Sequence, residues 1–525
     1  MPAMTAPPGS ESAARQQWGS PGTWEICTPP RASEVPRARE NGADGKGVQK
    51  SESLVVAVKP ENRGPWDPVE RRGDRVAEPE ERNMSETLSS GNVSTKLQRI
   101  AELASKDRTR VLSSVSHVID LEWMKEAYRR TRKSGAAGVD GCTAADYATN
   151  LEANLGALVE RVHKGTYTPP PVRRAHIPKA GGKKRPIGIP TFEDKVVQRA
   201  IAMVLEAVYE QDFHDLSFGF RPGRSAHDAL IELQRRPTYW NRCWIIEADI
   251  ESFFDTIDHA KLRSVLDQRV RDGVIRRLID KWLRAGVMEQ GRLWRPDSGT
   301  PQGGVISPLL ANIFLNEVLD QWLTKVVWPR TSGLMKFVRY ADDFVILFTQ
   351  EDMAKRVMAV LPKRFERYGL RLHPEKTRLL SFNNPDLAIP RAQRARSFDF
   401  LGFTHYWARS RKGRMVVKQR TAKGRFTRSL QNVRDRCRRM MHDPIEKQHR
   451  ALSAILRGHF NYFGITGNGD ALKRFHHYAE RIWGRSLARR TGRRFAWQRF
   501  QSLLKRRPLP PPHPPRSVCP SEPAT

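Results

Sequence analysis

The stretch Phe-Val-Arg-Tyr-Ala-Asp-Asp-Phe-Val-Ile-Leu-Phe, residues 337–348, contains two apolar runs of β-type that meet at adjacent carboxylates, Asp342 and Asp343. Such runs predict a buried β-hairpin with two acids at its tip. Two carboxylates are costly to bury unless a cation compensates them, so the pair indicates a divalent metal. For an isolated Asp-Asp pair, the alternative is a turn held by hydrogen bonds from side chain to backbone.

A third carboxylate favours the metal. Asp249 ends another strand-like run, Cys-Trp-Ile-Ile-Glu-Ala-Asp, residues 243–249. Transfer of a nucleotidyl group commonly uses two metal ions about 3.5–4 Å apart, which two or three converging carboxylates can hold. Mg²⁺ prefers a few carboxylates together with phosphates and water. The three acids therefore indicate a site for a nucleotide substrate and Mg²⁺.

Several blocks resemble known families. Tyr-Ala-Asp-Asp at 340–343, the Asp249 strand and Gly-Thr-Pro-Gln-Gly-Gly at 299–304 resemble reverse transcriptases. A narrower resemblance, to the multifunctional proteins encoded by bacterial group II introns, rests on three further blocks: Phe-Arg-Pro-Gly-Arg-Ser-Ala-His-Asp-Ala at 220–229, Ile-Ser-Pro-Leu-Leu-Ala-Asn-Ile-Phe-Leu-Asn at 306–316 and Gly-His-Phe-Asn-Tyr-Phe at 458–463. The resemblance runs from about Leu97 to about Lys505, with the blocks in the family's order.

The resemblance implies an α+β right-hand polymerase with fingers, a palm with an antiparallel sheet, and a helical basic thumb/maturase domain. We expect the fingers and an N-terminal helical extension in 93–190, the palm in 191–396 and the thumb in 397–507. Residues 1–92 lack a sustained hydrophobic period, and 508–525 are rich in proline. Both ends are therefore expected to be disordered.

The same resemblance assigns the catalytic carboxylates. Asp249, Asp342 and Asp343 would be catalytic, and these three residues together with Ile250 would bind the metal. The implied cofactor is a pair of Mg²⁺ ions, with Mn²⁺ as a possible substitute. In this arrangement, the 3′-hydroxyl of a primer attacks the α-phosphate of a nucleotide in line.

Five residues are assigned by resemblance to the incoming nucleotide: Lys179, Arg185, Phe254, Gln302 and Lys376. Lys179 and Arg185 lie in an expected β-hairpin, where their charges would neutralise the triphosphate. The alternative is a basic hairpin that grips the template backbone. For Lys376, a structural ion pair is an equally open interpretation.

Phe254 follows Asp249 by five residues, where a bulky side chain would exclude a 2′-hydroxyl and select dNTPs. The alternative is that Phe254 only packs the palm, because Phe253 is equally aromatic. Gln302 belongs to a glycine-rich loop that would open the helix from Ser307 to Asn316. Glycines permit close approach of backbone to phosphate, and helix N-termini offer free N–H groups.

The charge of the chain indicates nucleic acid partners. The formal net charge is +34, and residues 401–510 hold 28 Lys and Arg against five Asp and Glu. A positive block with interleaved aromatics is typical of phosphate neutralisation with base stacking. The aromatics have a simpler alternative, namely the core of a helical domain. The expected partners are intron RNA, target DNA with its primer, and dNTPs.

Other function classes are disfavoured. The five cysteines include no Cys-x-x-Cys pair, which argues against a zinc site or a disulfide framework. No run of about 18 apolar residues predicts a membrane span. We therefore expect a cytoplasmic, nucleoid-associated protein without a membrane partner.

The sequence thus predicts an RNA-directed DNA polymerase that copies group II intron RNA and assists its splicing and mobility. One alternative is an RNA-binding splicing cofactor with an idle polymerase site, against which the three retained acids argue. The other is a reverse transcriptase of a retron, a diversity-generating element or a CRISPR-associated system. The long basic region after Phe403 favours the intron type.

Overall fold

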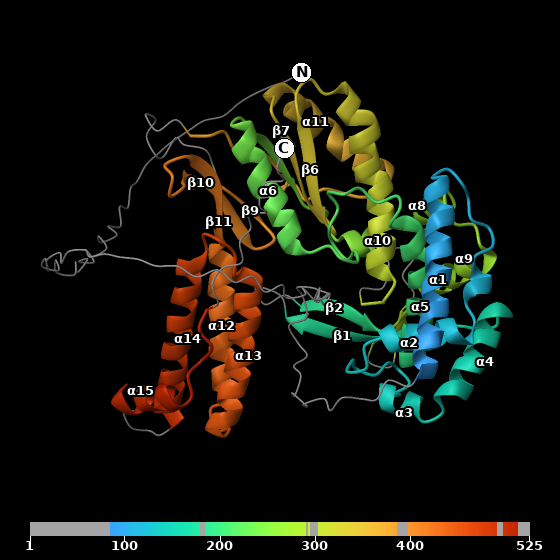
Figure 1. Cartoon of the computed structure of the whole chain (residues 1–525), viewed down its shortest axis with the longest axis horizontal. Helices are drawn as coiled ribbons and strands as arrows, with labels where there is room; N and C mark the ends of the chain where they lie inside the picture. Colours follow the sequence, from blue (N-terminus) through green and yellow to red (C-terminus); the bar gives the residue numbers. More distant parts are fainter. Residues whose placement is uncertain are drawn as a thin grey trace, which may run out of the picture. The chain divides into compact units, whose positions relative to one another are not determined.

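The computed structural model (Figure 1) describes residues 84–178, 184–289, 292–294, 303–385, 397–490 and 497–512. The N-terminal part is helical and is organised around one buried helix, α5 (Phe192–Tyr209). Around it lie α1 (Met84–Lys106), α2 (Leu121–Arg130), α3 (Ala144–Ala148) and α4 (Leu151–His163). Both α1 and α2 pack directly on α5, and the indole of Trp123 donates to the carbonyl of Ala200, 3.0 Å away.

Two elements lie partly within the segments that were expected to be disordered. Helix α1 begins at Met84, within the segment 1–92. At the other end, Leu509 is 3% exposed and the carbonyl of Pro508 contacts the ring of His449, so the chain packs at these two residues. The rest of the two predicted disordered ends lies outside the described residues.

The predicted basic hairpin is confirmed as two antiparallel strands, β1 (Val172–Pro178) and β2 (Lys184–Ile189). The residues that connect these two strands, 179–183, lie outside the described residues. Together with β4 (Val287–Glu289) and β5 (Arg292–Trp294), these strands form a sheet of order β2-β1-β4-β5.

A second sheet carries the Asp-Asp pair. It consists of β3 (Trp244–Ala248), β6 (Met335–Tyr340), β7 (Asp343–Phe348) and β8 (Arg378–Ser381), in the order β6-β7-β3-β8. Every neighbouring pair is antiparallel, as predicted. In the β6–β7 hairpin, Tyr340 pairs with Asp343, which leaves Ala341 and Asp342 as a two-residue turn.

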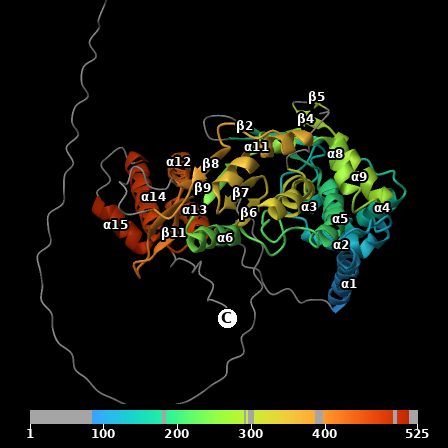
Figure 2. The same cartoon turned by 90° about the horizontal axis from the view of Figure 1, so that it is seen from above.

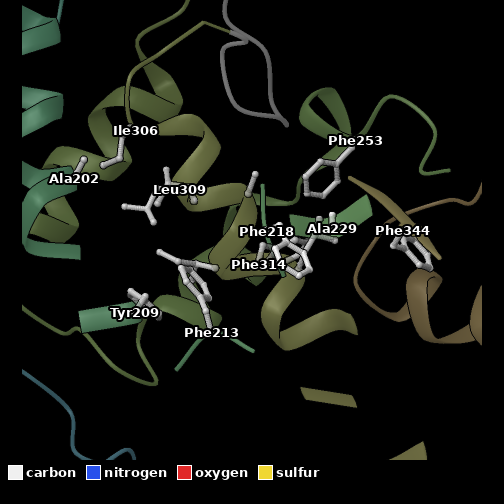
Figure 3. Close-up of a cluster of buried hydrophobic side chains, with 14 of the residues drawn as sticks. Ala202, Tyr209, Phe213, Phe218, Ala229, Phe253, Ile306, Leu309, Phe314 and Phe344 are labelled. Carbon is white, nitrogen blue, oxygen red and sulfur yellow. The ribbon is translucent and has the colours of Figure 1, made fainter. Parts of the chain in front are cut away.

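The helices of this part of the chain are α6 (Ala226–Trp240), α7 (Phe253–Thr256), α8 (His259–Leu266), α9 (Gly273–Arg284), α10 (Ser307–Leu315) and α11 (Glu351–Arg367). Of these, α6 contacts β6 of the second sheet. Helix α11 packs on β3 and β7, and α10 continues in wider turns to Val327. Figure 3 shows part of the resulting core, which includes the buried rings of Tyr209, Phe314 and Phe344.

The C-terminal part combines a small sheet with a helical bundle. The strands are β9 (Phe398–Phe400), β10 (Phe403–Arg409) and β11 (Met415–Thr421), all antiparallel. The helices are α12 (Lys423–Arg439), α13 (Ile445–Phe463), α14 (Gly469–Arg490) and α15 (Trp497–Arg506). Figures 1 and 2 both show α12, α13 and α14 side by side. The family resemblance also implies a strand pair at 398–403 that grips the primer end, and β9 with the start of β10 forms such a pair. The helical periodicity of residues 430–441 and 451–463 predicts two helices, and α12 and α13 each begin earlier in the chain than these stretches.

Most aromatic rings of this bundle form its core. Phe460, Phe475, Trp483 and Phe500 are at most 2% exposed, whereas Tyr478 is 45% exposed. The simpler interpretation of the interleaved aromatics therefore holds for these four rings. None of the helices in the described part of the chain combines the length and apolar character of a membrane span.

A fully buried ion pair holds the turn of the β6–β7 hairpin in place. The guanidinium of Arg339 donates to both carboxylate oxygens of Asp320, at 2.8 and 2.5 Å, and both side chains are 0% exposed. Arg339 also donates to Asn312 Oδ1 at 2.8 Å and to the carbonyl of Ala341 at 3.1 Å. Every neighbour of this guanidinium is thus an acceptor, which is the condition under which a buried charge is tolerated. Through these contacts the ion pair ties the turn to α10 and its continuation.

Replacing Arg339 should strongly destabilise the fold. Arg339→Met leaves Asp320 buried without a countercharge, so the free energy of unfolding should fall by about 3–5 kcal/mol. Urea unfolding monitored by circular dichroism measures this change. The control is Lys355→Met, whose pair with Glu351 on α11 is exposed to solvent and should contribute little to stability. Equal losses in the two variants would contradict this role for Arg339.

Candidate active site

The strands bring the three predicted carboxylates to one end of the second sheet. The β3–β7 register pairs Ala248 with Phe344, so the next residues, Asp249 and Asp343, come to stand opposite each other. Directly opposite residues of antiparallel strands direct their side chains to the same face. Asp342 lies in the adjoining turn. The predicted proximity of the Asp249 strand and the Asp-Asp hairpin is thus present in the structure.

Asp249 and Asp343 line a cleft of about 430 Å³. Its walls are the ends of β3 and β7, the segment before β8 and the turn between β9 and β10. The lining residues are Glu247, Ala248, Asp249, Asp343, Phe344, Glu375, Lys376, Arg378, Asp399, Phe400 and Leu401. Five of these are acids and two are bases, so the cleft favours cations.

The electrostatics of Asp343 show how strongly the acids interact. Asp343 is open to the cleft, yet the protein atoms around it and the charges of Asp342 and Asp249 raise its pKa to about 7. The charges of Lys376 and Arg425 act in the opposite direction. A divalent cation would relieve this repulsion far better than the two surrounding side chains, because it can contact several carboxylates at once.

The donor set fits a metal that is shared with a substrate. Within the described residues, no group of three or more His, Cys, Asp or Glu side chains is spaced as a complete metal site. Mg²⁺ bound by one or two carboxylates and by substrate phosphates needs no such group. The residues that could hold it are Asp249, Asp342 and Asp343.

Ile250 can add a backbone oxygen to this set. Ile250 pairs with Leu372 in an antiparallel bridge flanked by two hydrogen bonds, Glu251 N to Arg371 O and His373 N to Asp249 O. In such a pair the backbone N–H and C=O of the enclosed residue point away from its partner strand. The carbonyl of Ile250 is therefore directed toward the β7 side, where Asp342 lies.

Lys376 forms an ion pair with Asp249. Its Nζ donates to Asp249 Oδ2, while the backbone of the same segment holds Asp249 through the bond from His373 N. The structural ion pair considered from the sequence is therefore present. A contact of Lys376 with the nucleotide stays a prediction.

Phe253 and Phe254 differ in their surroundings. Phe253 is 3% exposed and belongs to the core, whereas Phe254 is only partly buried and its ring lies 5.3 Å from that of Phe253. The preceding Ser252 has a φ of +46°, a left-handed conformation that redirects the chain after Asp249. Of the two rings, Phe254 is therefore the one that is partly accessible to solvent.

A buried hydrogen-bond network holds the loop before α10. Gln198 Oε1 accepts from Val305 N at 2.7 Å and from Ile306 N at 3.3 Å, and Gln198 Nε2 donates to Asp194 Oδ2 at 2.9 Å. Asp194 Oδ1 accepts from Tyr167 and Trp282. The buried helix α5 thus sets the position of the loop.

Close packing supports the same loop. Gly303 has a φ of +113°, and a Cβ atom there would clash with the carbonyl oxygen of Gly188 on β2. Only glycine allows this approach of the loop to the basic hairpin.

For three of the residues that are predicted to contact the nucleotide, the structure describes no side-chain position. Lys179 and Gln302 lie outside the described residues. Arg185 is placed in β2 opposite Ile177, but its side chain is not among those described.

Sequence reasoning missed several residues that support the site: Asp194, Gln198, Asn312, Asp320, Arg339 and Arg425. One signal was available in the sequence, because Arg339 is a charged residue within the otherwise apolar strand that precedes the Asp-Asp pair. A charged residue in a buried strand requires a buried partner. Which residue supplies that partner could not be deduced from the pattern.

The network below the loop should make stability depend on pH. Burial raises the pKa of Asp194 from 3.8 to about 6. A raised folded pKa means that the stabilisation is complete below the unfolded value and is lost as the pH rises through about 6. Asp194→Asn has no such titration. The free energy of unfolding of the native protein, measured relative to this variant, should therefore fall by about 2 kcal/mol between pH 4.5 and 7.5. Urea unfolding at a series of pH values tests this, and parallel profiles would contradict it.

Comparison with known proteins agrees with this geometry. Residues 177–405 match the family model described as reverse transcriptase (RNA-dependent DNA polymerase). Protein YkfC of Escherichia coli K12 is 34% identical over 363 residues, which cover 62% of this chain and 91% of YkfC. The group II intron-encoded protein LtrA of Lactococcus lactis subsp. cremoris is 44% identical over 176 residues, which cover 33% of this chain and 29% of LtrA.

An uncharacterized 91 kDa protein in the cob intron of Schizosaccharomyces pombe is 41% identical over 170 residues, which cover 32% of this chain and 21% of that protein. The chain thus spans less than a third of the length of LtrA and of the yeast protein, but nearly all of YkfC. The chain therefore belongs to the reverse transcriptases, the family of RNA-dependent DNA polymerases, and its relatives include group II intron-encoded proteins.

Proposed function

We propose that this reverse transcriptase is encoded by a group II intron, copies the intron RNA into DNA and assists the folding, splicing and mobility of that RNA. The observation that best supports a polymerase site is that Asp249 and Asp343 stand opposite each other at the ends of two neighbouring strands. Both carboxylates line a cleft that Leu401, in the turn between β9 and β10, also lines. A primer end held at that turn would face the carboxylates.

Asp249 and Asp342 are the main ligands in this proposal, with Asp343 and the carbonyl of Ile250 completing the set. The metal ions, two Mg²⁺ or in their place Mn²⁺, would lower the pKa of the primer 3′-hydroxyl and neutralise the phosphates. Asp249 would exchange its contact with Lys376 for the metal. Lys376, which is 58% exposed, is then free to reach the nucleotide.

The remaining contacts with the nucleotide would come from the basic hairpin and from the loop before α10. Lys179 and Arg185 would neutralise the triphosphate, and Gln302 would lie beside the nucleotide. Phe254 would pack under the sugar, where a 2′-hydroxyl would collide with the ring. These roles make a dNTP the preferred substrate.

The C-terminal bundle is proposed to bind nucleic acid. Helix α12 exposes five cations to solvent, namely Lys423, Arg428, Arg434, Arg438 and Arg439. A row of cations on one helix fits a polyphosphate backbone. The proposed partners are intron RNA, the DNA target and the primer, in the cytoplasm and with the nucleoid.

The domain boundaries remain proposals as well. We assign 93–190 to the fingers, 191–396 to the palm and 397–507 to the thumb/maturase part. The change from palm to thumb falls just before β9, where the third sheet begins.

Loss of the carboxylates should abolish polymerisation. The double variant Asp342→Ala/Asp343→Ala should lose at least about 100-fold in primer extension on an RNA template with dNTPs and Mg²⁺, because metal ligands are removed. The matched control, Glu351→Ala/Asp352→Ala, removes an adjacent acidic pair at the start of α11 and should extend normally.

Splicing of the flanking RNA is assayed in parallel and should persist in the Asp342→Ala/Asp343→Ala variant. No extension by the native protein, with splicing intact, would instead favour a splicing cofactor. Undiminished extension by the variant would refute the proposed metal site.

Phe254 should determine the choice of sugar. Phe254→Ala removes the ring below the 2′ position, so the ratio of kcat/KM for dNTP over NTP should fall by about 10- to 200-fold. Single-nucleotide incorporation with matched dNTP and NTP measures this ratio. Phe253→Leu, which keeps a large apolar side chain in the core, serves as the control. An unchanged ratio in Phe254→Ala would assign the ring to packing alone.

A further inference from the structure

The turn between β9 and β10 adopts a conformation that its own sequence does not favour. Phe400 pairs with Phe403, which leaves Leu401 and Gly402 as a two-residue turn with φ of +50° and +79°. Two positive φ values define the turn that normally selects Asn-Gly or Asp-Gly. Glycine accepts this conformation, but for leucine it is unfavourable. Contacts from outside the hairpin must therefore hold the turn.

Those contacts come from the C-terminal helices. The hydroxyl of Tyr462 on α13 donates to the carbonyl of Leu401 at 2.8 Å. The backbone N–H of Ala422, directly before α12, donates to the carbonyl of Gly402 at 2.9 Å. Both carbonyls of the turn are thus bound by the bundle.

Arg425 covers the turn from the first part of α12. A Cβ atom on Gly402 would lie 3.1 Å from Arg425 Cγ and 3.2 Å from Arg425 Nε, so the arginine side chain lies against the glycine. Arg425 is also close enough to Asp343 for their charges to interact. The turn therefore lies between the bundle and the carboxylates.

Tyr462 is itself fixed from two sides. Its backbone carbonyl is the partner of His227 Nε2 on α6, at 2.8 Å, and the two rings lie 5.8 Å apart. Its ring also lies 5.8 Å from that of Phe403, the first residue of β10. A side chain tied to α6, to β10 and to the turn can transmit the position of the bundle to the cleft.

We propose that Tyr462 is a positioning residue for polymerisation: its hydroxyl fixes the Leu401–Gly402 turn, and with it the primer end, to the helical bundle that holds the nucleic acid. This inference rests on the proposed function, since the contact between the turn and the primer belongs to that function. Tyr462 does not touch the reacting atoms. It acts through the turn, so its removal should affect the primer rather than the nucleotide.

The test is Tyr462→Phe, which removes only the hydroxyl. We expect kcat/KM for the primer–template duplex to fall roughly 3- to 10-fold, as for the loss of one hydrogen bond, while KM for dNTP stays unchanged. Steady-state primer extension, with each substrate varied in turn, measures both quantities. Tyr478→Phe is the matched control, because Tyr478 lies on α14 of the same bundle, is 45% exposed and should leave both values unchanged.

A second variant separates positioning from simple stability. Leu401→Asn creates an Asn-Gly turn that favours two positive φ values without outside help. In the Leu401→Asn background, Tyr462→Phe should therefore cause little or no further fall in kcat/KM for the primer–template duplex. The ratio of the two losses is independent of any effect that Leu401→Asn has by itself.

The outcomes distinguish this inference from the proposed function. Absence of extension by the native protein would refute both. Normal extension by the native protein, with identical constants in Tyr462→Phe, would refute only the role of Tyr462. A loss of equal size in the Leu401→Asn background, or an equal rise in KM for duplex and dNTP, would assign Tyr462 a general structural role and overturn the inference.

Discussion

Repulsion among Asp249, Asp342 and Asp343 is the constraint around which the rest of the structure is built. The carboxylates stand at the ends of apolar strands, and burial together with the charges of Asp342 and Asp249 raises the pKa of Asp343 to about 7. An isolated sheet would relieve this repulsion by fraying at the turn. The hairpin stays closed because strong contacts hold it from the side opposite the cleft, above all the bond from Arg339 to the carbonyl of Ala341.

The same design recurs at three places around the cleft. Polar side chains hold each loop: Arg339 with Asp320 at the Asp-Asp turn, Gln198 with Asp194 beside the loop before α10, and Tyr462 at the Leu401–Gly402 turn. Gln198 and Tyr462 come from elements distant in sequence, whereas Arg339 lies in the hairpin whose turn it supports. Backbone in a rare conformation, such as Ala341 at a φ of +56°, persists only where the surroundings determine it in this way.

The elements of the fold could be predicted where a local pattern decides them. The Asp-Asp hairpin and the 398–403 pair follow from apolar strands around short turns, and α12 and α13 from helical periodicity. The start of α1 could not be predicted, because residues 84–92 are mostly polar and their helix depends on the packing of the rest of α1 against α5. The three acids could be recognised at the site, since each ends a strand. The side chains that support the site could not be recognised, because they act across long sequence distances. Gln198, for example, binds Val305, which lies 107 residues further along the chain.

The arrangement of the C-terminal helices links two tasks that sequence reasoning treats as separable. Helix α12 exposes cations along its length, and at its start Arg425 lies against the turn that faces the carboxylates. A helix is stiff over this distance, because each residue is held by a hydrogen bond to the preceding turn. Under the proposed function, RNA bound along α12 would restrain the end of the helix that supports the turn. A nucleic acid that shifts the bundle would then also shift the primer end relative to Asp249 and Asp343, so the proposed function implies that binding and polymerisation are mechanically coupled.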